Sequence, residues 1–271
     1  MKHSYLLILL LLILPGCDDP SLDQGDTSGD EILEPMPSLV ELSSIDIAEN
    51  QPGNITDQIQ LSYDNNGLIE LINFGGSLNL TYELTYADNN RLIGIQSSGN
   101  NSIAYTINYP ADEIVMSFTE GNTQIERRLF TDTQNRINRI LEFSTDSNGN
   151  RMQSLDRRFE YNQNFNVTRI NNFDAASNLI SYVELDYEFN NNPFRDMNDV
   201  LRLLLFPDFV PYTRYLPLEQ REFSLTSGNT VLLRSISYTY QLREDQFPVS
   251  REVTLTEMSG STTSFEFFNY R

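Results

Sequence analysis

The chain has 271 residues and a formal net charge of −20, which comes from 38 acidic and 18 basic side chains. A chain this acidic has no basic stripe to neutralise phosphates, so nucleic acid is excluded as a partner. One cysteine and one histidine exclude an internal disulfide, a thiolate zinc cluster and a cysteine–histidine catalytic pair; we expect no cofactor and no metal site.

The first seventeen residues have the pattern of a secretion signal. Lys2 gives a basic start, residues 6–14 form an unbroken Leu/Ile run, and a proline and a glycine precede Cys17. This ending resembles the lipobox of bacterial lipoproteins, in which the cysteine carries the lipid, although the proline departs from its commonest form. A transmembrane anchor needs roughly 20 apolar residues, about twice this run. We expect a signal peptide over 1–16, lipidation of Cys17 and loss of His3 with the signal.

The next segment is acidic and almost free of apolar side chains. Between Cys17 and Asn90 the chain carries no basic residue, and Arg91 is the first. Residues 17–38 cannot bury enough apolar surface to offset their ordering entropy. We predict an acidic disordered tether over 17–38 and a single antiparallel β domain over 39–271. The acidic charge of the tether serves solubility, or it keeps the tether clear of anionic lipid headgroups.

A repeated hairpin pattern begins near residue 59. Apolar and polar residues alternate, a polar turn rich in Asn and Asp interrupts them, and a second apolar run follows. The closing aromatic residues Tyr63, Tyr86 and Tyr109 are spaced by 23 residues, and later copies end at Phe130, Tyr161 and Tyr187. Such alternation gives each strand one apolar face that must be buried. We predict an all-β fold, an antiparallel meander of hairpins that forms a curved or barrel-like sheet.

One segment has helical spacing instead. Residues 196–206 place Met197, Val200, Leu201 and Leu204 on one face, which predicts a short amphipathic helix. An irregular loop delimited by Pro207, Pro211 and Pro217 should follow, with strands resuming near residue 219. The helix is expected to plug one end of the sheet, with a ligand lid as the alternative.

These features resemble a known family. The lipobox, the Tyr-closed hairpins, the segment from Tyr187 to Phe194 and Tyr238-Thr239-Tyr240 with Phe247-Pro248 are similar to uncharacterised lipoproteins of Gram-negative bacteria, described as having a porin-like fold. The hairpins also resemble the tyrosine–aspartate repeats of large secreted toxins. The resemblance implies no catalytic residue. A membrane-spanning strand needs roughly 9–11 residues, whereas most runs here have about five to seven, so we expect a water-soluble barrel.

The sequence offers little catalytic equipment. Acidic residues in strands could form the carboxylate pair of a glycosidase, but a solvated strand face explains them more simply. They are Glu142, Glu160, Glu184, Glu188, Glu222 and Glu252. Asp146-Ser147-Asn148-Gly149-Asn150 resembles the start of a calcium loop, but Arg157 stands where the bidentate Glu belongs, so we predict a hairpin turn. Enzymatic activity is not expected.

Three functions stay open. The first is a lipid-anchored envelope protein, non-enzymatic, that binds or scaffolds an envelope protein or glycan through residues that the sequence does not identify. Tyrosines and the arginine pairs at 127–128 and 157–158 suit recognition, or they pair with acids on neighbouring strands. The alternatives are a carrier of lipid or hydrophobic cargo and a carboxylate-dependent hydrolase. The partner membrane is expected to be the outer membrane, on its periplasmic face or the cell surface, because acidic residues follow Cys17.

Overall fold

The computed structural model describes residues 41–271 except 78, 100–101, 112, 196, 206–213 and 227–228, and of Leu205 only the backbone. These residues belong to a unit that spans Val40–Arg271. The signal peptide, Cys17 and the tether lie outside the described residues. Their assignment stays a prediction.

The described residues form sixteen strands and one short helix. The strands are β1 (Leu42–Glu49), β2 (Ile55–Tyr63), β3 (Ile69–Gly75), β4 (Leu80–Tyr86), β5 (Leu92–Ser98), β6 (Ala104–Asn108), β7 (Glu113–Glu120), β8 (Thr123–Thr131), β9 (Ile137–Thr145), β10 (Arg151–Tyr161), β11 (Val167–Phe173), β12 (Leu179–Asn191), β13 (Tyr215–Thr226), β14 (Asn229–Leu242), β15 (Pro248–Glu257) and β16 (Gly260–Tyr270). The helix α1 (Asp199–Leu205) lies between β12 and β13.

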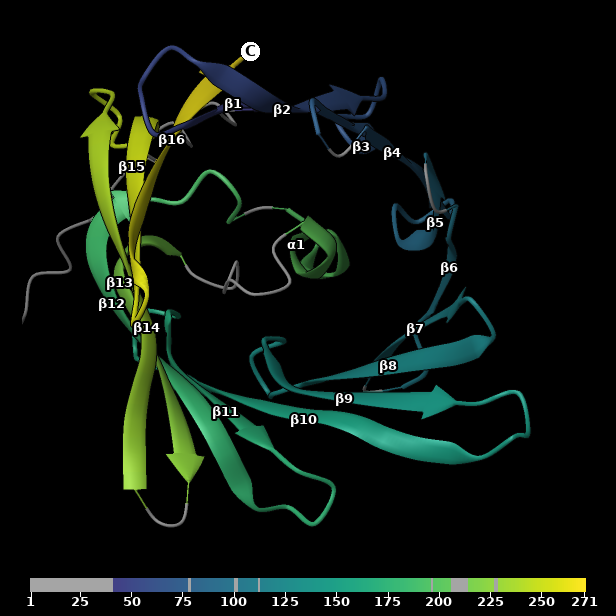
Figure 1. Cartoon of the computed structure of the whole chain (residues 1–271). Helices are drawn as coiled ribbons and strands as arrows, with labels where there is room; N and C mark the ends of the chain where they lie inside the picture. Colours follow the sequence, from purple (N-terminus) through teal and green to yellow (C-terminus); the bar gives the residue numbers. More distant parts are fainter. Residues whose placement is uncertain are drawn as a thin grey trace, which may run out of the picture. The chain divides into compact units, whose positions relative to one another are not determined.

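The sheet closes on itself. Each strand pairs with its neighbours in sequence in antiparallel fashion, and β1 pairs with β16 through partners such as Ile45 and Phe268, which completes a barrel (Figure 1). The amide of Arg271 donates to the carbonyl of Glu41 over 2.9 Å and extends this last pair. The predicted all-β meander of hairpins is confirmed, and it is a closed barrel.

Short polar turns connect the strands, as the Asn- and Asp-rich breaks predicted. In the β2–β3 turn, the carboxylate of Asp64 accepts hydrogen bonds from the amides of Asn66 and Leu68, and Gly67 has a positive φ of 78°. The carboxylate of Asp132 and the side-chain oxygen of Asn162 accept the same pair of amides in later turns. Each side chain thus replaces backbone hydrogen bonds that the tight turn leaves open.

The interior of the barrel is apolar around α1. Val200 is 0% and Leu201 1% exposed, and both belong to a core cluster with strand residues such as Ile72, Leu92 and Met116. Figure 1 shows α1 inside the ring of strands. Because these strand side chains pack with a helix inside the barrel, the apolar phase of the strands around α1 faces inward.

The outer wall carries the polar phase of the same strands. In β4, Glu83 and Thr85 are exposed, whereas Tyr82 is buried. In β14, exposed Ser237 and Thr239 alternate with buried Ile236 and Tyr238. The predicted strand length of five to seven residues is right only for β3 to β6 and β11: β1, β2 and β7 to β9 have eight or nine residues, and β10 and β12 to β16 have 10 to 14. The polarity of the inner and outer strand faces, rather than strand length, therefore characterises this barrel.

The helix lies where the spacing predicted it, in a shorter form. The side chain of Asn198 caps it by accepting the amide of Val200 over 2.9 Å. Its apolar side chains are packed inside the barrel, as expected of a plug. The loop prediction for Pro217 is wrong: this proline lies in β13 at a register shift opposite Tyr187, a position that tolerates a missing amide donor. Among the described residues, no helix combines the length and apolarity that a membrane crossing requires.

Candidate functional site

A ring of tyrosines marks one end of the barrel, which we call the tyrosine end. Near the end of an even-numbered strand, each tyrosine hydroxyl donates to a backbone carbonyl at the start of the strand before it, over 2.6–2.8 Å. The pairs are Tyr63–Leu42, Tyr86–Ile69, Tyr109–Leu92, Tyr161–Ile137, Tyr187–Val167, Tyr240–Pro217 and Tyr270–Pro248. The sixteen strands form eight consecutive pairs, from β1–β2 to β15–β16, and a tyrosine ties seven of these pairs together at this end.

The eighth pair, β7 with β8, has a threonine in this place. Thr131 pairs with Ile137 across a register shift, as Tyr63 pairs with Ile69 and Tyr161 with Val167. Phe130, which closes this repeat in the sequence, is not equivalent, because it lies on the opposite strand face to buried Leu129. The tyrosine ring is therefore interrupted at Thr131.

A recess of about 700 Å³ opens at this interruption. We call it the Thr131 recess. Its lining residues come from the β6–β7 and β8–β9 turns and the adjoining strand ends, from Arg91 of the β4–β5 turn and from the first residue of α1. They are Arg91, Tyr109, Pro110, Ala111, Glu113, Ile114, Thr131, Asp132, Thr133, Asn135 and Asp199. Its size falls in the usual range for small-molecule sites, roughly 300–1,000 Å³.

The start of α1 borders the recess. Asn198, which caps the helix, hydrogen-bonds to Tyr109, on one side of the gap; burial raises the pKa of Tyr109, and this bond partly offsets the rise. Burial also raises the pKa of Tyr161, on the other side, and Asp199 contributes to that increase. The helix thus begins between the two tyrosines that flank Thr131.

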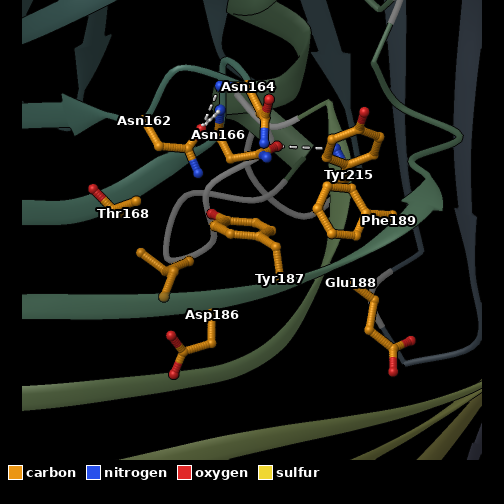
Figure 2. A pocket seen from close by; sticks show the side chains of 10 residues that line it. Asn162, Asn164, Asn166, Thr168, Asp186, Tyr187, Glu188, Phe189 and Tyr215 are labelled. Carbon is orange, nitrogen blue, oxygen red and sulfur yellow. Dashed lines mark hydrogen bonds between the residues drawn. The ribbon is translucent and has the colours of Figure 1, made fainter.

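A second, smaller recess lies further along the tyrosine end (Figure 2). It has about 170 Å³ and is lined by three asparagines of the β10–β11 turn together with Tyr187, Phe189 and Tyr215. The side-chain oxygen of buried Asn166 accepts the amide of Tyr215 over 3.0 Å. Phe189 is 75% exposed and packs edge-on against the ring of Tyr215. This recess is too small for more than a fragment of a ligand.

Part of the interior wall is charged. Arg127 pairs with Glu142 over 2.6 Å and Arg251 with Glu266 over 2.8 Å. Arg127 lies beside buried Met116 in the β7–β8 register, so this pair faces inward. A helix about 10 Å wide cannot fill a barrel of sixteen strands. These ion pairs line part of the interior wall, and their charges nearly balance. The side chain of Arg127 is 29% exposed to solvent.

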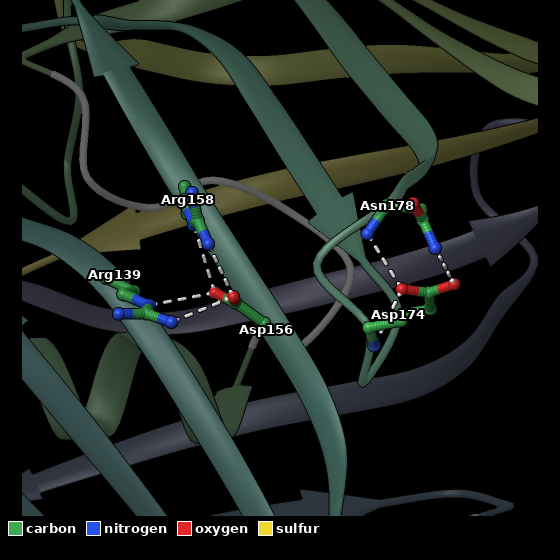
Figure 3. Close-up of polar contacts among 6 residues, drawn as sticks. Arg139, Asp156, Arg158, Asp174 and Asn178 are labelled. Atoms are coloured by element: carbon green, nitrogen blue, oxygen red, sulfur yellow. Dashed lines mark hydrogen bonds and ion pairs between the residues drawn. The ribbon is translucent and has the colours of Figure 1, made fainter.

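The arginine pairs predicted as recognition candidates are divided between the two faces. Because neighbours on a strand point to opposite sides, Arg127 and Arg157 face inward whereas Arg128 and Arg158 face outward. On the outer wall, the carboxylate of Asp156 is 1% exposed and accepts hydrogen bonds from Arg139 and Arg158 (Figure 3). Burial alone would raise the pKa of Asp156, but the hydrogen bonds from these guanidinium groups outweigh it and lower the pKa. Because the charges of Asp156, Arg139 and Arg158 are paired with one another, we interpret this cluster as structural rather than as a binding site.

The predicted carboxylate candidates do not gather into one catalytic cleft of the described structure. Glu142 pairs with Arg127 and Glu222 with Arg234, on the inner face; Glu184 lies within 4 Å of Arg169 and Arg221. Glu160 accepts a hydrogen bond from Asn171, and Glu188 accepts one from Asn190. Glu252 lies in β15 opposite Thr239 and Phe265, away from these pairs in the register.

The calcium-like segment is a hairpin turn, as predicted. The carboxylate of Asp146 accepts the amides of Asn148 and Asn150 between β9 and β10. Asp174 and Asn178 make the same contact in the β11–β12 turn (Figure 3). No group of three potential metal ligands occurs among the residues described.

Sequence reasoning identified the spacing of the tyrosines but not the site that it implies. A strict 23-residue period after Tyr109 falls on Asp132, where the expected tyrosine is absent. That absence was the available signal for the Thr131 recess. The signal was weak, because the later repeats are longer and their register is set by bulges.

Comparison with known proteins gives structural neighbours. No protein-family model matches the chain, and no curated protein does. The chain is similar to a porin-like protein from Bacteroides uniformis, with 13% identity and a TM-score of 0.40 over 85% of this chain and 96% of that one. It is also similar to a porin-like protein from Bacteroides vulgatus, with 14% identity and a TM-score of 0.42 over 86% of this chain and 99% of that one.

Proposed function

We propose that the protein is a lipid-anchored envelope protein, without enzymatic activity, whose barrel stands in water and binds a ligand at the tyrosine end. One observation carries the first part: apolar side chains face the interior around α1, and polar side chains such as Glu83, Thr85 and Thr239 face outward. A barrel in a bilayer has the opposite arrangement, with an apolar outer band.

A water-exposed barrel needs another attachment to reach the membrane. The lipid expected on Cys17 provides it, with residues 17–38 as an acidic tether between lipid and barrel. Apolar chains buried in a bilayer hold a protein by about 0.8 kcal/mol per methylene group, so acylation at more than one position anchors stably. We place the protein at the outer membrane, on the periplasmic face or the cell surface.

The tyrosine end is the face best suited to binding. It holds the Thr131 recess, a smaller recess and the exposed rings of Phe165 and Phe189, which are 44% and 75% exposed. Exposed aromatic rings of this kind are common at recognition surfaces. The interaction partner is an envelope protein or glycan.

Two alternatives have less support. A carrier of hydrophobic cargo needs free apolar space under the helix, but Val200 and Leu201 are packed into the core there. A carboxylate hydrolase needs an acid with a raised pKa. In the described part of the chain, the carboxyl groups with a shifted pKa all have it lowered; they are Asp57, Asp64, Asp132, Asp146, Asp156 and Asp174.

The anchor can be tested by fractionation. The full chain and its Cys17→Ala variant are expressed in a Gram-negative host with a labelled fatty acid, and Ser21→Ala serves as a matched control. We expect label and membrane retention in the full chain and the control, and a soluble, unlabelled barrel in the Cys17→Ala variant. Membrane retention of that variant after carbonate extraction would contradict the proposal. Protease treatment of intact cells then separates surface display from the periplasmic face.

A further inference from the structure

We propose that the Thr131 recess binds a neutral saccharide. This inference rests on the proposed binding function and gives it a site and a ligand class. It starts from the interrupted ring: seven strand pairs are closed by a tyrosine, and the pair β7–β8 is left open above a recess of about 700 Å³.

The register defines what is missing. Tyr161 donates to Ile137, the register neighbour of the residue just before that tyrosine, and Tyr86 donates to Ile69 in the same way. In β8 the residue before Thr131 is Phe130, whose partner is Glu113. A tyrosine at 131 would therefore reach the backbone carbonyl of Glu113, and its ring would occupy the space that the recess now has.

Glu113 borders the recess at the start of β7. In the register it lies opposite Phe130, on the same outer strand face as Arg128, which lies 3.6 Å from its carboxylate. The polar groups offered to a ligand are therefore those of the other lining residues.

Charge balance favours a neutral ligand over a cation. The carboxylates of Asp132 and Asp199 each have a guanidinium partner: Asp132 pairs with Arg136 over 2.6 Å, and Asp199 pairs with Arg202. Arg91 adds one more positive charge at the rim. Little uncompensated negative charge is left for a metal ion or a basic peptide.

The other lining groups suit a polyhydroxylated molecule. Arg91, Thr131, Thr133 and Asn135 offer donors and acceptors, while Tyr109, Pro110 and Ile114 offer apolar surface for the C–H face of a sugar ring. The guanidinium of Arg91 stacks on Tyr109 at 5.1 Å, which orders the rim. The volume fits one or two sugar rings.

The test measures binding by calorimetry with the full chain in amine-oxide micelles, which contain no sugar headgroup. The probes are glucose, galactose, mannose, N-acetylglucosamine and their 1,4-linked disaccharides, with a hexalysine peptide as the cationic probe. We expect at least one saccharide and not the peptide to bind. Thr131→Tyr should reduce affinity at least 100-fold by filling the recess, and its melting temperature should equal or exceed that of the unchanged protein.

A further variant keeps the test informative if Thr131→Tyr misfolds. Arg91→Ala should weaken saccharide binding about tenfold, as expected for the loss of one charge-assisted hydrogen bond. Thr85→Tyr, on the exposed outer wall, is the matched control and should leave affinity unchanged. The inference is overturned if no saccharide binds, if a folded Thr131→Tyr variant still binds, or if hexalysine binds in the recess instead. None of these outcomes affects Cys17-dependent anchoring, so the two proposals fail separately.

Discussion

The hydroxyl of Tyr63 donates to the backbone carbonyl of Leu42 over 2.6 Å, and this bond ties β2 to β1 beside the place where the barrel closes. Leu42 in turn pairs with Tyr270, whose own hydroxyl donates to Pro248. The same tyrosine contact therefore occurs in the first and the last strand pair of the domain. The repeated tyrosines of the sequence thus lie on both sides of the β1–β16 junction that closes the barrel.

Removing one such bond should destabilise the barrel measurably. Tyr161→Phe deletes a largely buried hydroxyl that donates to Ile137 over 2.6 Å and leaves that carbonyl without this donor. We expect a loss of about 1–2 kcal/mol in the free energy of unfolding, measured in urea. Tyr182→Phe, on the outer wall where the ring stacks on Phe223, is the control and should change it by less than about 0.5 kcal/mol. Equal effects would argue against the ring as a stabilising feature.

The tyrosine ring also predicts a loss of stability at alkaline pH. Burial, with a smaller contribution from Glu41, raises the pKa of Tyr63 to about 12. The unfolded side chain has a pKa of about 10. The folded state therefore holds this proton more tightly, so the contribution to stability is complete below about pH 10 and is lost as pH rises towards 12.

Urea titrations at pH 9 and pH 11.5 check this. The stability of the protein should fall between the two, and Tyr63→Phe should reduce the fall because it removes one ionisable hydroxyl. A Tyr63→Phe variant with an unchanged pH dependence would show that other groups control alkaline unfolding.

Phe165 is strained where it stands. Its φ is +64°, a left-handed conformation that is unfavourable for a bulky side chain by roughly 1–2 kcal/mol, and its ring is 44% exposed. Phe165→Gly should raise the free energy of unfolding by about 1 kcal/mol. Asn135→Gly, at the same point of the β8–β9 turn, is the control; asparagine tolerates this conformation, so the gain should be smaller. A destabilised Phe165→Gly variant would mean that the contact of the ring with Arg136 outweighs the strain.

Asp156 should contribute to stability only above acidic pH. Its folded pKa is lowered below the unfolded value of about 3.9, so its contribution is present above that pH and is lost as pH falls through the folded pKa. Asp156→Asn should reduce stability by about 2 kcal/mol at pH 7, because Arg139 and Arg158 lose a buried partner. The difference from the unchanged protein should shrink towards pH 2. Asp186→Asn, 58% exposed beside Arg221, should have little effect at either pH.

Local patterns predicted most of the elements. Alternation identified the strands, and the spacing of Val200, Leu201 and Leu204 identified the helix within a few residues of its observed bounds. The Asn- and Asp-rich breaks predicted turns because their side chains cap tight hairpins locally. These features depend on neighbours in sequence, which is why the sequence alone indicated them.

Closure and the binding site depend on distant residues. Nothing local connects Ile45 with Phe268, more than 200 positions apart, and two-residue alternation does not specify how many strands close a barrel. Bulges shift the register, so the missing tyrosine falls at Thr131 rather than at the position that a strict period gives. The sequence predicts a loop at Pro217 for the same reason, because the bulge that makes room for it in a strand is not visible in the local pattern.

The central claim, that the outer wall of the barrel stands in water, can be measured with spin labels. If Cys17 carries the proposed lipid, a cysteine introduced by Thr85→Cys or Thr239→Cys is the only free thiol, and each position lies exposed on the outer wall. The labelled, lipidated chain is reconstituted into phospholipid vesicles, and collisions with a water-soluble nickel chelate and with oxygen are compared. We expect the nickel chelate to dominate at both positions. Oxygen dominating at either would place that wall in the bilayer and contradict the account.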